Sequence, residues 1–255
     1  MRFASLGSGS EGNALLVCVG ETQVLLDCGF SLKDSIARMA CLGIMPEQLS
    51  GILVTHEHGD HIGGVARLAR NFDLPVWLTH GTLRSQPKAF AGISALHEID
   101  PHGVFSIRDI EIFPYPVPHD AAEPVQFVFG DGARRLGVLT DVGCSTPHIE
   151  AMLSGCDALV LESNHDAGML MNGDYPYSLK QRVGGRFGHL SNQESAAILV
   201  NLNTDRLQHL VAAHLSSRNN TPELAIEALS AALGCEKSWV GVATQETGFD
   251  WREIV

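Results

Sequence analysis

The sequence predicts an α+β fold in which two β-sheets pack face to face and helices cover the outer faces. Strand-like apolar runs and helical stretches occur in both halves of the chain. No Gly- or Pro-rich linker separates the halves, and no repeat of fixed period is present. The chain has 255 residues, of which 45% are hydrophobic, so it can bury a substantial core. Two such halves bury their apolar surfaces by stacking sheet on sheet.

The first half alternates apolar runs with helical stretches. A helix begins after Ser31, a suitable N-cap, and ends at Gly43, a typical C′ residue. A second helix is expected over residues 62–70, and residues 80–92 are helical in pattern but interrupted by Pro87. The strand-like runs cover residues 3–7, 14–19, 23–27, 51–55 and 75–79.

The second half begins with an antiparallel meander between residues 95 and 140, with a turn at Asp131-Gly132. Its short runs cover residues 105–107, 110–113, 125–129 and 135–140. Later strands are expected over residues 157–162, 207–213 and 239–243. Helices are expected at residues 147–155, from the capping box at Ser191 to about residue 202, and from Thr221 to Gly234.

The stretch VTHEHGDHIGG, residues 54–64, contains four chemically active side chains within six residues: His56, His58, Asp60 and His61. Buried without partners they would carry a large desolvation cost. Neutral imidazoles and carboxylates are preferred ligands of zinc and related ions. The stretch joins a strand to a helix, so we expect residues 56 and 58 to face one ion and residues 60 and 61 another. The alternative, a polar loop that caps a helix, needs one polar side chain and not four.

Three later residues, each with a side chain that can bind a metal, come at the end of an apolar strand or in a proline-containing loop. His119 lies in the loop that leaves the meander, and Asp141 and His214 each end an apolar strand. Each alone is typical of a hydrogen-bonded residue at the rim of a sheet. All three together with the 54–64 loop predict a second set of metal ligands. Asp27, another carboxylate at a strand end, is expected to pair with one of the ligating histidines.

Composition excludes several classes of protein. The net charge of −12 argues against a general nucleic-acid binder with a basic face, although local clusters can differ in sign. No apolar run approaches the roughly 20 residues that span a membrane, and the N-terminus has no signal-peptide pattern. Six scattered cysteines without a Cys-x-x-Cys pair indicate reduced thiols. We therefore expect a cytoplasmic protein with no membrane segment.

The H-x-H-x-D-H motif, followed by His, Asp and His, resembles the metallo-β-lactamase superfamily. The resemblance spans nearly the whole chain and implies one four-layer αββα sandwich domain over residues 1–255. It implies that one ion is held by His56, His58 and His119. It implies that the other is held by Asp60, His61 and His214, with Asp141 bridging the two. True β-lactamases usually have cysteine at the bridging position, so Asp141 resembles the phosphodiesterase, nuclease and glyoxalase branches instead.

Five further stretches resemble the bacterial YycJ/WalJ-type subgroup of this superfamily. They are residues 5–13, 26–29, 162–166, 188–192 and 214–220. The subgroup is regarded as a DNA exonuclease acting from the 5′ end, and it is related to the tRNA 3′-processing and RNase J nucleases. Only 73 positions separate Asp141 from His214, too few for the extra domain of RNase J-type enzymes. A long Gly/Pro-rich arm for gripping tRNA is also missing, so DNA is favoured over RNA.

The implied mechanism is hydrolysis of a phosphodiester by a hydroxide activated by two divalent metal ions about 3.5–4 Å apart. Asp60 and Asp141 would orient this hydroxide. His189 precedes a capped helix and is the candidate acid for the leaving oxygen, since related nucleases use a histidine from this segment. A surface histidine beside a helix is the alternative. Zinc and manganese both suit such ligands, and iron is possible.

Several cations and small polar residues are candidates for substrate binding. Residues 166–190 are expected to form a lid over the site. The lid carries Lys180, Arg182 and Arg186, and Arg218 lies four residues after His214. The glycine-rich loop 7–13 offers Ser8, Ser10 and Asn13 to an anion. A solvated lid helix and a flexible hairpin are the respective alternatives.

Four other residues near the lid have open roles. Tyr175 and Tyr177 can stack a base or pack at the rim. His165 and Asp166 can contact either ligands or substrate. At the level of function, the alternatives to a nuclease are a small-molecule phosphodiesterase or cyclic-phosphate hydrolase, and a metal-binding regulatory module without catalysis.

Overall fold

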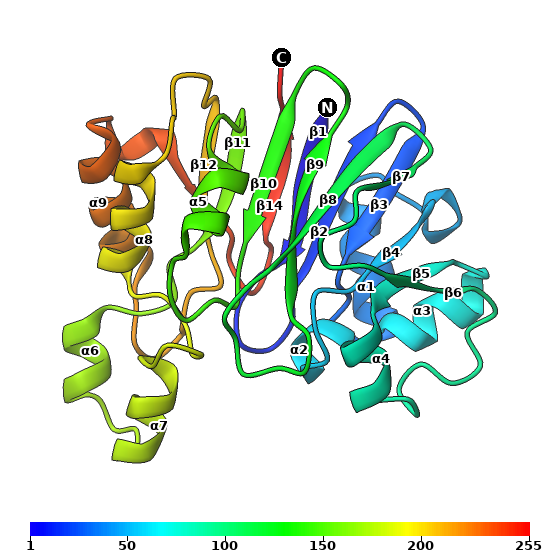
Figure 1. The fold of residues 1–255 in the computed structure, drawn as a ribbon, viewed down its shortest axis with the longest axis horizontal. Helices are drawn as coiled ribbons and strands as arrows, with labels where there is room; N and C mark the ends of the chain where they lie inside the picture. The colour runs from blue at the N-terminus through cyan, green and yellow to red at the C-terminus, as the bar shows by residue number, and fades with distance from the viewer.

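Two seven-stranded sheets form the centre of the computed structural model, which describes residues 1–255 (Figure 1). The first sheet has the order β14 (Phe249–Glu253), β1 (Arg2–Gly7), β2 (Ala14–Val19), β3 (Thr22–Leu26), β4 (Gly51–Leu53), β5 (Val76–Thr79) and β6 (Leu96–Ile99). The second has the order β13 (Val240–Val242), β12 (His209–Ala213), β11 (Ala158–Glu162), β10 (Arg135–Leu139), β9 (Val125–Gly130), β8 (Ile110–Pro116) and β7 (Phe105–Ile107). Strands β3 to β6 are mutually parallel, as are β10 to β13, and the other pairs are antiparallel.

Helices cover the outer face of each sheet (Figure 1). The first sheet is accompanied by α1 (Leu32–Cys41), α2 (Gly59–Ile62), α3 (Val65–Phe72) and α4 (His80–Ser85). The second is covered by α5 (Pro147–Leu153), α8 (Asn192–Asn201) and α9 (Pro222–Leu233). The short helices α6 (Ala167–Asn172) and α7 (Tyr177–Val183) project at the lower left of Figure 1. Two 3₁₀ turns, Pro46–Gln48 and Lys237–Trp239, complete the elements.

Three hydrophobic cores separate these layers. In β12, Val211 and Ala213 belong to the core between the sheets, whereas Leu210 and Ala212 belong to the core beneath α8 and α9. A third core lies between the first sheet and helices α1 and α3. Successive side chains of a strand point to opposite faces, so strands buried on both faces read as continuous apolar runs. The predicted four-layer αββα sandwich is confirmed.

The structure differs from the sequence prediction mainly at sheet edges. Strands β6 and β14 were not predicted, because both are edge strands whose polar residues face solvent and break the apolar pattern. The helix expected over residues 62–70 begins instead at Val65 as α3, and Gly63 and Gly64 separate it from the short helix α2, which ends at Ile62. A Cβ at Gly64 would collide with the carbonyl oxygen of Phe30, so the break lets the two segments approach closely.

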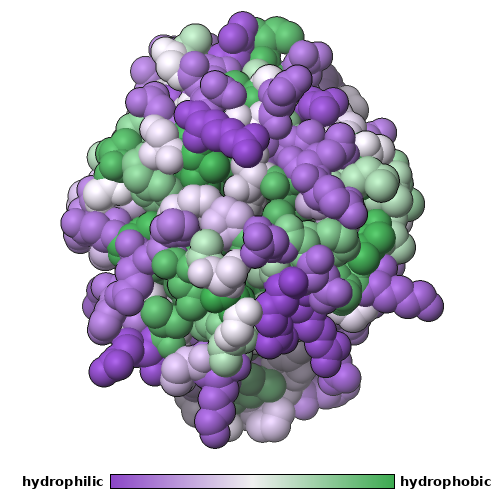
Figure 2. Space-filling view, turned by 90° about the vertical axis from the view of Figure 1, so that its right-hand side faces the viewer, coloured by the Kyte–Doolittle hydropathy of each residue, from purple (hydrophilic) through white to green (hydrophobic).

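The surface on the side of β6 and α3 mixes hydrophilic and hydrophobic residues (Figure 2). None of the helices has both the length and the apolar character that crossing a membrane requires.

Candidate metal centre

The first histidine cluster joins the 54–64 loop to the loop that follows β8. His56 Nε2 lies 2.9 Å from His58 Nδ1, and His119 Nε2 lies 3.3 Å from the same atom. Two nitrogens bound tetrahedrally to zinc at 2.0–2.1 Å are separated by about 3.3 Å. The three nitrogens therefore have the spacing of ligands to one cation.

The second cluster lies beside the first and contains Asp60, His61 and His214. Asp60 Oδ2 is 3.4 Å from His61 Nε2 and 3.7 Å from His214 Nε2. Asp141 lies between the clusters, with Oδ2 3.2 Å from His61 Nε2 and Oδ1 3.9 Å from His119 Nε2. The structure thus brings all seven predicted ligands together from four separate parts of the chain.

The ring nitrogens that face away from the clusters are hydrogen-bonded. His61 Nδ1 is 2.8 Å from Asp27 Oδ2, which confirms the partner expected for Asp27. His214 Nδ1 is 2.9 Å from Glu162 Oε1, and His119 Nδ1 is 3.1 Å from the carbonyl oxygen of Gly188. In the neutral imidazole each of these nitrogens donates its proton, so the opposite Nε2 would present a lone pair to a cation in the cluster.

The donor set fits divalent cations. Asp141 Oδ2 and His214 Nε2 are buried without a hydrogen-bond partner. Asp141 Oδ2 lies 3.2 Å from His61 Nε2 but makes no hydrogen bond with it. Buried polar atoms without partners are rare and costly, and cations bound between the clusters would satisfy both atoms.

The pKa values of His214 and Asp141 also indicate a site that favours positive charge. Burial alone would lower the pKa of His214, but Asp141, Asp60 and Glu162 outweigh it and raise the pKa to about 10. Burial alone would raise the pKa of Asp141, but His214 and His61 hold it well below its usual range. Protons on imidazoles balance buried carboxylates in the metal-free chain, and divalent cations supply the same charge when they bind.

The backbone at three strand ends is left-handed. Asp27, Asp141 and His214 have φ values of 58°, 52° and 55°, and each directly follows or closely follows a parallel strand. Such conformations are uncommon outside glycine, although Asp and His tolerate them better than most residues. They turn the chain sharply at the rim, and conformations of this kind concentrate at functional sites.

His189 lies against the same cluster. Its Nδ1 is 2.9 Å from Glu162 Oε1, the oxygen that also accepts from His214, and its side chain is 22% exposed. Burial opposes a raised pKa, but Glu162 outweighs it and raises the pKa of His189. Because Nδ1 is occupied, Nε2 is the atom that can exchange a proton with a bound molecule.

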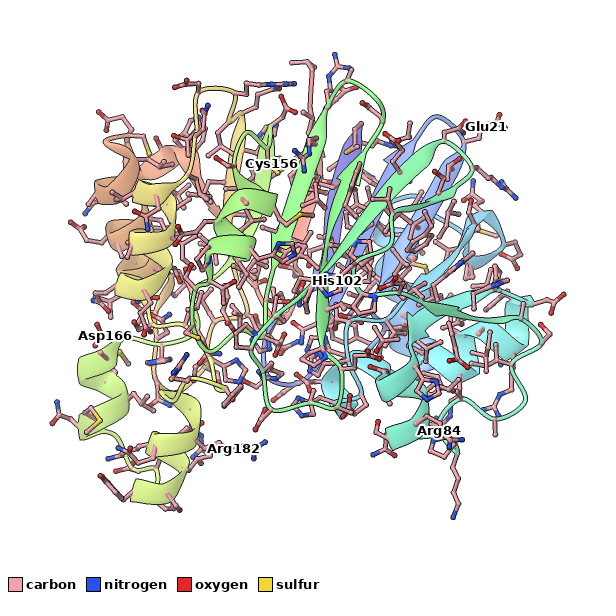
Figure 3. The ribbon with its side chains drawn as sticks, in the orientation of Figure 1. Glu21, Arg84, His102, Cys156, Asp166 and Arg182 are labelled. Atoms are coloured by element: carbon pink, nitrogen blue, oxygen red, sulfur yellow. The ribbon has the colours of Figure 1, made fainter.

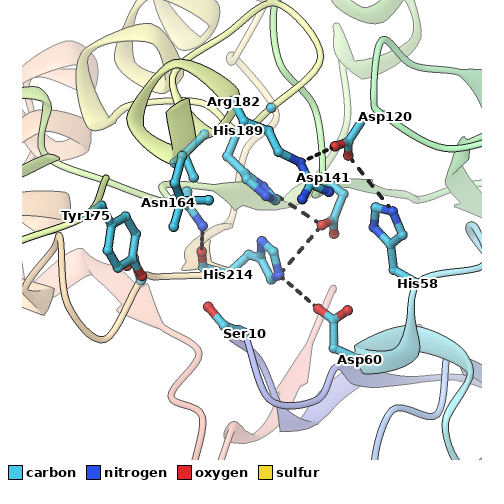
Figure 4. Close-up of a pocket in the computed structure, with 14 residues that line it drawn as sticks. Ser10, His58, Asp60, Asp120, Asp141, Asn164, Tyr175, Arg182, His189 and His214 are labelled. Carbon is cyan, nitrogen blue, oxygen red and sulfur yellow. Dashed lines mark hydrogen bonds and ion pairs between the residues drawn. The ribbon is translucent and has the colours of Figure 1, made fainter. Parts of the chain in front are cut away.

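A cavity of about 210 Å³ opens between the clusters and α7 (Figure 4). Asp60, Asp141, His189 and His214 line one side, and Tyr175 and residues of α7 line the other. Arg182 extends from α7 into this space and its Nε lies 2.6 Å from Asp120 Oδ2 (Figures 3 and 4).

The candidate substrate-binding residues occupy different positions. Ser10 and Arg182 line the cavity. Ser8 and Asn13 are buried and hydrogen-bonded to each other, and Asn13 Nδ2 also lies 3.3 Å from Asp60 Oδ2. Ser8 Oγ accepts the backbone N–H of His214 at 2.9 Å, so both residues contact metal ligands. The remaining candidates, Lys180, Arg186 and Arg218, do not line the cavity.

The four residues whose roles the sequence left open lie in different environments. Asp166 caps α6, since its Oδ1 accepts the backbone N–H of Met169 at 2.8 Å. His165 is buried, and its Nδ1 has no hydrogen-bond partner. Tyr175 lines the cavity, whereas Tyr177 is 72% exposed.

Sequence reasoning missed Glu162 and Thr55. Glu162 ends the fully buried strand β11, the same signal that singled out Asp141, and could have been found by it. No sequence pattern indicates Thr55, because its role depends on contacts with Asp27 and His56. Its hydroxyl donates to Asp27 Oδ2 at 2.8 Å and accepts from His56 Nδ1 at 2.9 Å, so His56 also presents Nε2 to the first cluster.

Comparison with known proteins agrees with this geometry. Residues 22–214 match the family described as the Beta-lactamase superfamily domain. The chain belongs to the beta-lactamase superfamily. It is 37% identical over 249 residues to the exodeoxyribonuclease YycJ of Bacillus anthracis, covering 95% of this chain and 93% of that protein. It is 32% identical over 228 residues to the exodeoxyribonuclease WalJ of Streptococcus pneumoniae, covering 88% and 85% of the two chains.

Among solved structures, the metallo-beta-lactamase fold protein YhfI from Bacillus subtilis superposes with a TM-score of 0.78 at 17% identity, covering 98% of each chain. At this identity the likeness shows the fold. With the YycJ and WalJ relatives, superfamily membership makes the chain a metal-dependent hydrolase, and the predicted subgroup resemblance is confirmed.

Proposed function

We propose that this chain is a DNA exonuclease that uses two divalent cations and digests strands in the 5′ to 3′ direction. The observation that carries the proposal is the convergence of two ligand clusters and His189 on one cavity. The names of the YycJ and WalJ relatives support DNA as the substrate.

The proposed first ion is held by His56, His58 and His119. The proposed second ion would be held by Asp60, His61 and His214, and Asp141, which lies between the two clusters, would serve both. When bound, a pair of divalent cations lowers the pKa of a water molecule toward about 7 and offsets charge on the phosphoryl oxygens. Zinc, manganese and iron all suit these imidazole and carboxylate donors.

The chain's own groups supply orientation and a proton. Asp60 and Asp141 orient the attacking water, whose oxygen bonds to phosphorus as the bond to the leaving oxygen breaks. His189 donates a proton from Nε2 to that leaving oxygen. Glu162 holds the ring of His189 through Nδ1 and stabilises its protonated form. The products are a nucleoside monophosphate and a shortened strand.

Arg182 and Ser10 are proposed to contact the phosphates that flank the cleaved bond, because both line the cavity. Arg182 Nε is held by Asp120, so its two terminal amino groups are free for a phosphate. Ser8, Asn13, Lys180, Arg186 and Arg218 complete the proposed substrate-binding set, the first two through the loop they stabilise. We further propose one catalytic domain over residues 1–255, with residues 166–190 as its lid, acting in the cytoplasm, where six free thiols are stable.

Purified protein with added Mn²⁺ or Zn²⁺ tests the proposal on three DNA substrates. These are a linear duplex, the same duplex with phosphorothioate linkages at its 5′ ends, and a closed circle. We expect shortening of the linear duplex, protection by the 5′ modification and no cleavage of the circle. Cleavage of the circle would rule out an exonuclease, and equally fast shortening of the 5′-modified duplex would contradict the 5′ to 3′ direction.

The ester bis(p-nitrophenyl) phosphate separates the alternative functions. Turnover of this ester without any DNA shortening would indicate a small-molecule phosphodiesterase. Inactivity on both with metal bound would indicate a regulatory module. The variants His58→Ala and Asp141→Ala should abolish both activities.

A further inference from the structure

The cavity has two chemically different walls. The wall formed by the metal centre consists of imidazoles and carboxylates, among them Asp60, Asp141 and His214. The large apolar side chains that line the cavity, Leu179 and Val183, come from α7, together with the ring of Tyr175 just before it. A molecule that fills this cavity therefore meets the metal centre on one side and, beside Arg182, an apolar surface on the other.

The apolar wall is built by the spacing of α7. Leu179 and Val183 are four residues apart and lie on one face of the helix. Tyr175 is four residues before Leu179 and continues the same surface across Pro176. Tyr177 is 72% exposed and does not line the cavity, so the two tyrosines of the lid have separate environments.

The ring of Tyr175 is held in place. Pro176 follows it, and a residue before proline is confined to extended conformations. The guanidinium carbon of Arg218 lies 5.9 Å from the centre of the Tyr175 ring, within the range of a cation–π contact. Figure 4 shows this ring on the opposite side of the cavity from His58 and Asp120.

Resting on the proposed function, we propose that Tyr175, Leu179 and Val183 form a subsite for the base of the terminal nucleotide. Every nucleobase presents a flat π-face, and stacking on an aromatic ring tolerates any sequence. Leu179 and Val183 offer no hydrogen-bonding groups, so this wall accepts all four bases. The cavity of about 210 Å³ is far smaller than a duplex, so it admits the end of a single strand.

The subsite makes the base, and not only the phosphate, a determinant of binding. The test compares thymidine 5′-monophosphate with 2-deoxyribose 5-phosphate, which has the same phosphate and sugar but no base. Both are titrated calorimetrically into the full-length protein in the presence of Mn²⁺. We expect the nucleotide to bind about tenfold more tightly, as stacking of one base allows.

Substitutions test which residues provide the additional affinity for the base. Tyr175→Ala should bring the two dissociation constants together, Tyr175→Phe should keep them apart, and Leu179→Ala should reduce the gap. Tyr177→Ala is the matched control and should behave as wild type. Equal affinities in the wild-type protein, an unchanged gap in Tyr175→Ala, or the same loss in Tyr177→Ala would each overturn the subsite.

The same protein samples keep this inference separate from the proposed function. Hydrolysis of DNA and of bis(p-nitrophenyl) phosphate is measured alongside the titrations. If the wild-type protein hydrolyses neither, the nuclease proposal fails, while the binding comparison still decides the subsite. If it hydrolyses DNA but the base adds nothing to binding, only the subsite is wrong.

Discussion

The histidines of the metal centre are oriented by partners that do not face the clusters. Asp27 shows how closely one such partner is fitted. Its Oδ1 accepts the backbone N–H of Thr55 at 2.9 Å, and its Oδ2 accepts both the Thr55 hydroxyl and His61 Nδ1 at 2.8 Å. Three donors on one buried carboxylate fix the ring of His61 before any ligand arrives.

Asp27→Asn should therefore weaken metal binding about 10–100-fold. An asparagine replaces one acceptor oxygen by an NH₂ group, which would face a donor, and it removes the charge next to His61. Competition with a chromophoric chelator measures the affinity. The matched control, Asp205→Asn, changes an exposed carboxylate and should keep wild-type affinity. Full affinity in Asp27→Asn would contradict the orienting role.

His189 differs from the metal ligands because its Nε2 is proposed to donate a proton and not to bind a cation. Substitution His189→Ala should lower kcat on DNA by about 10²–10⁴-fold, the usual contribution of a general acid. The loss on bis(p-nitrophenyl) phosphate should be much smaller, because p-nitrophenolate leaves without being protonated. Kinetics on both substrates, with metal content measured by mass spectrometry, check this.

His148→Ala, at an exposed histidine of α5, is the matched control and should retain wild-type rates. Equal losses on DNA and on the ester would mean that His189 acts in some way other than as an acid.

At the scale of elements, the strand ends and one helix start build the rim. Helix α8 begins with a complete capping box, in which Ser191 and Glu194 bond to each other's backbone N–H. Ser191 lies two residues after His189 and pairs with His165 in an isolated bridge. The bridge thus joins the end of the lid segment to the loop that follows β11.

Ser191→Ala should destabilise the protein by about 1 kcal/mol, the usual cost of losing an N-cap. Urea denaturation monitored by circular dichroism measures the change. Ser238→Ala, at an exposed serine outside any cap, should leave the midpoint unchanged. An unchanged midpoint in Ser191→Ala would show that the capping box contributes nothing to stability.

On the scale of the whole molecule, the metal centre joins the two sheets. Its residues follow β3 and β4 in the first sheet and β8, β10 and β12 in the second. In the metal-free protein, buried Asp141 depends on charged imidazoles for its balance. Cations bound at this junction should therefore stabilise the entire sandwich.

Metal removal should lower the melting temperature by roughly 10 °C. A cation at 1,000 times its dissociation constant contributes about 4 kcal/mol to the folded state, and about 2–4 °C follows per kcal/mol in a chain of this size. Differential scanning fluorimetry with chelator and with added Zn²⁺ or Mn²⁺ measures the shift. In Asp141→Ala the shift should disappear, and a shift of the same size there would place the stabilising ion elsewhere.

Much of this organisation could be predicted from local sequence. Residue type and spacing predict the metal-binding role of the 54–64 loop, and apolar runs predict the buried strands. Glu162 was missed although its strand gave the same signal as that of Asp141. Strands β6 and β14 were not predicted, because edge strands carry polar residues at their solvent-facing positions.

The four-layer fold, the family and the seven candidate ligands could all be predicted from sequence, because apolar periodicity and ligand chemistry are properties of short segments. Three features required the folded chain: which ring nitrogens face the clusters, the contact of Glu162 with both His189 and His214, and the position of Tyr175, but not Tyr177, in the cavity lining. These features depend on distances between segments far apart in the chain, and such distances exist only once the two sheets have packed.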